Sequence, residues 1–167
     1  EMTVSLRRRE SRTWTLPVLF LTVVLGCMTT ASADVKRVRS QTVYVPAYSH
    51  IYYGDREQPF YLTVTLSIRN TDPAYPITLL SVDYFDTDGK LIKRYQDSDA
   101  KLPPIGSTRF VVKESDKSGG SGANFIVKWK AGTRGTEPII ETVMVSTATQ
   151  QGISFTSRGQ AIEETVE

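Results

Sequence analysis

The chain has 167 residues, with 20 Lys and Arg, 18 Asp and Glu, one histidine and one cysteine. Four of the basic and two of the acidic residues fall within the first 33 residues. The remaining residues, 34–167, therefore carry 16 basic and 16 acidic side chains and no net charge. This balance argues against a nucleic-acid-binding or anionic-membrane-binding surface. The single histidine and cysteine exclude an intrachain disulfide and any metal site built on two imidazoles, and we expect no cofactor.

The first 33 residues predict a bacterial export signal. Four arginines precede an apolar run from Trp14 to Met28, and the small residues Ala31 and Ala33 mark a signal-peptidase site. The run is shorter than the roughly 20 apolar residues of a membrane-spanning helix, and Pro17 interrupts it. We therefore expect cleavage after Ala33 and release into the periplasm or cell envelope.

Cys27 offers a second cleavage site. The sequence Val24 to Cys27 resembles a lipoprotein box, in which the cysteine is acylated and becomes the first residue, although Leu25 is larger than is usual there. The signal would then be residues 1–26. The protein would be an outer-membrane lipoprotein whose membrane contact is the lipid alone. The cut after Ala33 is preferred, and the lipoprotein remains the alternative.

Beyond the signal, the chain predicts about eight short β-strands and no helix. Strict alternation over 61–70 places Leu62, Val64, Leu66 and Ile68 on one face, which is typical of a half-buried strand. The other strands are predicted over 42–46, 77–85, 91–95, 108–112, 124–130, 139–147 and 152–157. We expect an antiparallel, immunoglobulin-like β-sandwich over residues 34–158, followed by a flexible tail over 159–167.

Few residues of this domain predict catalysis or metal binding. His50 is the only histidine, and its neighbour Ser49 would point to the opposite face of a strand, so the two make a poor catalytic pair. Asp83, Asp86 and Asp88 lie close together, but the Asp-Gly sequence that follows favours a hairpin turn over a calcium loop. We expect no catalytic residue and no metal site.

Residues 44–55 form the strongest candidate for a binding surface. Tyrosine combines a large apolar area with a polar tip, and aromatic residues are enriched at protein and glycan interfaces. The candidate contact residues are Tyr44, Tyr48, His50, Tyr52 and Tyr53. The alternative is that these rings cover the open end of the sandwich and pack into its core.

A glycine-rich loop is the second candidate. Its residues are Ser118, Gly119, Gly120, Ser121, Gly122 and Asn124. Long polar loops on rigid sandwiches often carry binding surfaces, and backbone N–H groups of such loops can hold anions. The alternative is a flexible hairpin tip, because the loop leads into a strand and lacks the Lys-Ser/Thr ending of a phosphate-binding loop.

Three segments resemble a bacterial domain-of-unknown-function family, number 3124. They are residues 42–54 (TVYVPAYSHIYYG), 118–129 (SGGSGANFIVKW) and 151–159 (QGISFTSRG), and the resemblance spans residues 40–160. It implies a short exported or lipoprotein-like chain and supplies no activity or catalytic residue. More loosely, residues 64–112 are similar to extracellular immunoglobulin-like accessory domains.

These observations favour an exported, non-catalytic binding or accessory module. Its expected partner is an envelope protein or a glycan. The alternatives are a structural or assembly subunit that pairs through its edge strands and, more remotely, a hydrolase with an unconventional site.

Overall fold

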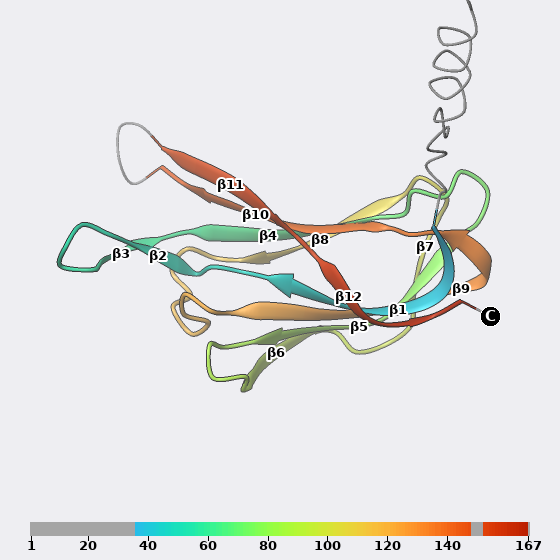
Figure 1. The fold of residues 1–167 in the computed structure, drawn as a ribbon, viewed down its shortest axis with the longest axis horizontal. Helices are drawn as coiled ribbons and strands as arrows, with labels where there is room; N and C mark the ends of the chain where they lie inside the picture. Colours follow the sequence, from blue (N-terminus) through green and yellow to red (C-terminus); the bar gives the residue numbers. More distant parts are fainter. Residues whose placement is uncertain (1–35, 148–151, 167) are drawn as a thin grey trace, which may run out of the picture. The chain divides into compact units, whose positions relative to one another are not determined.

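The computed structural model describes residues 36–147 and 152–166, which form twelve β-strands and no helix (Figure 1). The predicted signal, with Cys27, Ala31 and Ala33, lies outside the described residues. In this part of the chain, no helix has the length and apolar character needed to cross a bilayer. Every strand pairing is antiparallel, which confirms the predicted all-β sandwich.

The strands form two larger sheets and one small one. The first sheet has the order β12 (Gln160–Thr165), β1 (Arg37–Pro46), β9 (Asn124–Thr136), β5 (Ile77–Phe85) and β6 (Leu91–Gln96), and β7 (Ala100–Leu102) also pairs with β5. The second has the order β11 (Ile153–Arg158), β10 (Ile139–Ser146), β4 (Thr63–Arg69) and β8 (Ser107–Val112). The small sheet is the hairpin of β2 (His50–Tyr53) and β3 (Gln58–Tyr61).

The core consists of the alternate residues that the strands bury. In β4 and just before it, the four apolar residues predicted to share a face are all fully buried. Phe125, Val127 and Trp129 of β9 and Tyr84 of β5 are also fully buried within the same core. Each large apolar side chain buried in this way contributes about 1.5–3 kcal/mol, so a core of this size stabilises the sandwich without a disulfide.

The hairpin between β5 and β6 forms as the sequence predicts. Asp86 Oδ1 accepts hydrogen bonds from the backbone N–H groups of Asp88, at 3.0 Å, and Lys90, at 2.8 Å. Gly89 adopts a φ of 79°, a left-handed conformation that glycine tolerates. These bonds give Asp86 a turn-forming role.

Strand β9 is longer than expected. The sequence predicted a strand over 124–130, but β9 continues through Gly132 and Gly135 to Thr136. Its partner β1 pairs with it on both sides of an irregularity between Val38 and Ser40. Backbone pairing with β1 therefore keeps the segment that contains Gly132 and Gly135 in the strand.

The prediction of a flexible tail over residues 159–167 is wrong. Residues 160–165 form β12, which pairs with β1, and Thr42 Oγ1 donates a 2.9 Å hydrogen bond to Glu163. Gly159 lets the chain cross between the sheets: its N–H bonds to the Ile140 carbonyl at 2.8 Å, and a Cβ there would lie 2.7 Å from Val43 Cγ1. Backbone pairing orders this polar segment, although its side chains bury little apolar area.

Candidate functional site

Three rings form a row on one face of the β2–β3 hairpin. His50 pairs with Tyr61 across the hairpin, and Tyr52 lies two residues beyond His50 on the same face. The His50 ring contacts Tyr52 edge-on, with centroids 5.0 Å apart, and Tyr61, with centroids 5.8 Å apart. We call His50, Tyr52 and Tyr61 the aromatic strip. Tyr52, with 54% of its surface exposed, leaves most of its ring available for a partner.

The opposite face of the hairpin anchors it to the domain. Phe60 is buried in the core, and Ile51 packs against the core. Tyr53 lies on this face and meets the Phe60 ring edge-on at 6.2 Å, although much of Tyr53 is exposed. In Figure 1 the hairpin extends past the neighbouring strands. The core contacts therefore hold the aromatic strip on a rigid support.

The strip ends at a polar hollow. Lys117 Nζ lies 4.2 Å from the centroid of the Tyr61 ring, a cation–π contact. Beside it, Tyr61, Lys113, Glu114 and Ser115 line an open depression of about 510 Å³. Sequence reasoning missed Tyr61 and these charged neighbours as site residues. The sequence could have revealed Tyr61, because the register of a hairpin around Gly54 places Tyr61 opposite His50.

The other two predicted tyrosines lie elsewhere. Tyr44 is on β1, where it pairs with Gln160 of β12 and is partly exposed. Tyr48 packs against the core and contacts the Phe155 ring at 6.0 Å. Of the five candidate rings, His50 and Tyr52 belong to the strip and Tyr48 packs against the core, whereas Tyr44 and Tyr53 are exposed outside the strip. A binding role for these rings stays a prediction.

The glycine-rich loop is held against the domain. The Gly119 carbonyl accepts hydrogen bonds from Thr87 N–H, at 3.0 Å, and Thr87 Oγ1, at 3.1 Å. Gly122 N–H donates to Thr87 Oγ1 at 3.0 Å, and the Gly120 carbonyl accepts from Ser49 N–H at 3.1 Å. This packing differs from the flexible tip considered from the sequence.

The remaining candidates of the loop are also engaged. Ser118 donates from its N–H and its hydroxyl to Asp116 Oδ1, at 3.0 and 2.5 Å. Asn124 begins β9 and pairs with Pro46 and Phe85. Ser121 is half-buried within the loop. These contacts give residues 118–124 a packing role, and a contact role for the loop stays a prediction.

Ser49 and His50 have separate partners. The Ser49 hydroxyl lies 2.9 Å from the Tyr84 hydroxyl in a buried hydrogen bond, and burial raises the pKa of Tyr84 above its ordinary value. His50 belongs to the aromatic strip. Within residues 36–147 and 152–166, no three acidic, His or Cys side chains gather as a metal would require.

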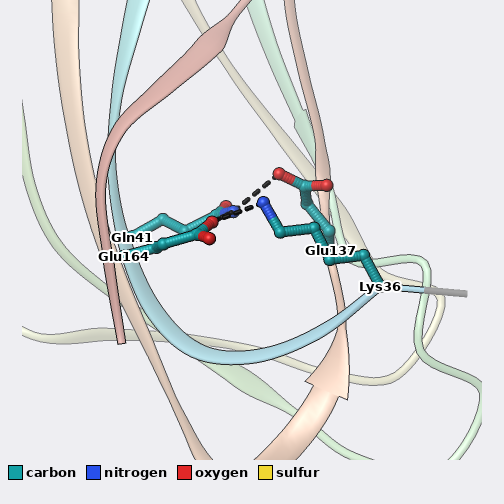
Figure 2. Close-up of polar contacts among 4 residues, drawn as sticks. All are labelled: Lys36, Gln41, Glu137 and Glu164. Atoms are coloured by element: carbon teal, nitrogen blue, oxygen red, sulfur yellow. Dashed lines mark hydrogen bonds and ion pairs between the residues drawn. The ribbon is translucent and has the colours of Figure 1, made fainter. Parts of the chain in front are cut away.

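A polar cluster joins the two ends of the described domain. Gln41, only 3% exposed, donates from Nε2 to Glu137 at 2.6 Å and to Glu164 at 3.4 Å (Figure 2). Lys36 forms an ion pair with Glu164, and this contact raises the pKa of Lys36 and lowers that of Glu164. The sequence held no sign of this cluster, because Gln41 and Glu164 lie on β1 and β12, Lys36 precedes β1 and Glu137 follows β9.

The comparisons with known proteins identify a family. A family model described as "Protein of unknown function (DUF3124)" matches residues 40–162. The chain belongs to this family. The DUF3124 match runs from β1 into β12 and contains the whole aromatic strip. It confirms the resemblance noted in the sequence, and its description assigns no activity.

The structural comparison adds one distant neighbour of this DUF3124 member. A structure titled "Crystal Structure of Thermotoga maritima 1070" shares 10% sequence identity with it, over 77% of this chain and 97% of that chain, with a TM-score of 0.44. No curated protein matches the chain.

Proposed function

We propose that this protein is an exported, non-catalytic binding module of the cell envelope that engages its partner through the aromatic strip. The observation that carries the proposal is the hairpin itself. One of its faces is anchored in the core through Phe60 and Ile51, while the other presents His50, Tyr52 and Tyr61. Export is supported by the signal-like sequence of residues 1–33.

The aromatic strip has the properties of a recognition surface. Rigid rings lose little conformational entropy on binding and supply a large contact area, and they are enriched among residues that dominate binding energy. The edge-on contacts of His50 with both tyrosines fix the orientation of the rings before a partner arrives. This preorganisation reduces the entropic cost of association.

The proposal also accounts for the only histidine. Its ring lies between two tyrosines, and the adjacent Ser49 hydroxyl is engaged by Tyr84. Neither side chain is placed to activate the other, so the histidine acts in this proposal as a contact residue.

Capture from an envelope extract tests this function. Tyr52→Ala should reduce partner capture at least tenfold, because an aromatic hot-spot residue contributes about 2 kcal/mol or more to binding. Tyr75→Ala is the matched control, since Tyr75 is 48% exposed but lies in the turn before β5. Equal capture by both variants and the unaltered protein, with an unchanged melting temperature, would refute the role of the strip.

A further inference from the structure

The outer side of β4 continues the surface of the aromatic strip. Burial alternates without a break from Phe60 to Ile68, so Tyr61, Thr63, Thr65 and Ser67 all face away from the core. The strip on β3 and the outer face of the four-stranded sheet therefore form one surface. From Tyr61 to Arg69, at about 3.3 Å per residue, this surface is roughly 26 Å long.

The middle of this surface carries no charged side chain. Alternation and register place small hydroxyl-bearing and β-branched side chains beside one another across all four strands. These residues are Thr63, Thr65, Val111, Val143, Val145, Ser154 and Thr156. Hydroxyl groups both donate and accept hydrogen bonds, and so complement a ligand that is itself rich in hydroxyls.

The far end of the surface is a block of two arginines and two serines. Ser67 pairs with Arg109, and Arg69 pairs with Ser107, so the arginines occupy diagonal positions on neighbouring strands. Diagonal Cα atoms lie about 7–8 Å apart, within reach of one shared ligand for two long side chains. Arg69 Nε donates to Ser67 Oγ at 3.1 Å, which positions one guanidinium group.

This end carries an excess of positive charge. Arg158 and Glu141 pair on the neighbouring strands β11 and β10, so three guanidinium groups share the face with one carboxylate. In the part of the chain that the structure describes, none of the three arginines forms an ion pair. The net charge of the domain is zero, but the charge on this face is not.

Resting on the proposed function, we propose that the partner is an acidic glycan that lies along the outer side of β4. Its sugar rings stack on the exposed Tyr52, its hydroxyls bond to the threonines, and its acidic groups bind Arg69 and Arg109. Guanidinium groups bind carboxylate and phosphate oxygens in a bidentate manner, so the shared chemistry is an oxyanion on a sugar chain.

Binding measurements with defined polymers test this inference. The probes are oligogalacturonate for carboxylates, dextran phosphate for phosphates, and neutral dextran of matched length. We expect binding of one or both acidic probes and none of neutral dextran. Arg69→Gln/Arg109→Gln should weaken that binding at least tenfold and flatten its dependence on salt, because two charge contacts are lost.

Two further variants distinguish the outcomes. Arg39→Gln/Arg134→Gln removes the same charge from exposed positions on β1 and β9 and should bind like the unaltered protein. Tyr52→Ala should weaken binding but keep the salt dependence. Equal losses in both arginine variants, equal binding of neutral dextran, or tighter binding of oligothymidylate would overturn the glycan proposal. If Tyr52-dependent capture from the extract persists without binding of either acidic probe, the glycan inference fails and the proposed function stands.

Discussion

The Tyr84 and Ser49 hydroxyl groups lie 2.9 Å apart, directly next to Gly119 of the glycine-rich loop. Tyr84 belongs to β5, whereas Ser49 immediately precedes the β2–β3 hairpin. The loop thus closes over a buried hydrogen bond that links the core to the base of the aromatic strip. A side chain at residue 119 has no room there.

Gly119→Ala should destabilise the fold. The added Cβ would collide with the Tyr84 hydroxyl and lie 2.7 Å from Ser49 Oγ. Overpacking of this kind costs about 1–3 kcal/mol, measurable as a lower urea midpoint. Gly132→Ala is the control, because a Cβ at residue 132 meets nothing within 4 Å.

A double variant shows whether the collision is the cause. Tyr84→Phe removes the obstructing oxygen, so the loss caused by Gly119→Ala should be smaller when Phe is at residue 84. Strictly additive losses would mean that the Tyr84 hydroxyl is not what excludes a side chain at residue 119.

The strands that the sequence predicts well are those in which side-chain burial follows alternation. Leu62, Val64, Leu66 and Ile68 alternate with polar residues, and all four are buried. Segment 160–165 has no such pattern, because its order comes from backbone pairing with β1 and from the crossing at Gly159. The information that places β12 therefore lies partly in the free edge of β1, which a local pattern does not reveal.

The sequence could predict only that site residues on the same strand share a face. His50 and Tyr52 are two residues apart, so their common face follows from the period of a strand. Tyr61 joins them only through hairpin register, and Arg69 meets Arg109 only because β4 pairs with β8 across about 40 residues of sequence. Cross-strand register, which depends on the assembled sheet, was the missing information.

Asp72 should make stability depend on acid pH. Its carboxylate accepts backbone N–H bonds from Ala74 and Tyr75, each at 2.9 Å, and from Thr136 at 3.0 Å. The bond from Ala74 contributes most to lowering the pKa of Asp72, and those from Thr136 and Tyr75 add to it against the opposing effect of burial. The stabilisation is complete above the unfolded-chain pKa, near 3.9, and is lost as pH falls through the lower native value.

Asp72→Asn tests this dependence. At pH 7 the variant should lose about 1–3 kcal/mol, because charge-assisted hydrogen bonds are replaced by weaker ones. The difference in unfolding free energy should shrink as the pH falls below about 4. A difference that stays constant from pH 7 down to pH 2 would show that the charge of Asp72 contributes nothing.

Removing β12 should destabilise the domain and expose an edge of the sheet. A chain ending at Arg158 loses the backbone bonds of five residue pairs with β1. At about 1 kcal/mol net per hydrogen bond, we expect a loss of roughly 2–4 kcal/mol in urea unfolding. Sedimentation should also show association, since the free β1 edge can pair with another chain. A chain that lacks only residues 166 and 167 is the control and should match the unaltered protein.

Gln41 should contribute more to stability than Lys36, although both contact Glu164. Gln41 is buried and bonds to Glu137 at 2.6 Å, whereas Lys36 forms an exposed ion pair that solvent weakens. Gln41→Ala removes the part-buried bond to Glu137 and should lower the unfolding free energy by about 1–3 kcal/mol. Lys36→Ala should have a smaller effect that disappears in high salt. If the order were reversed, the exposed ion pair and not the buried amide would be the stronger of these two contributions.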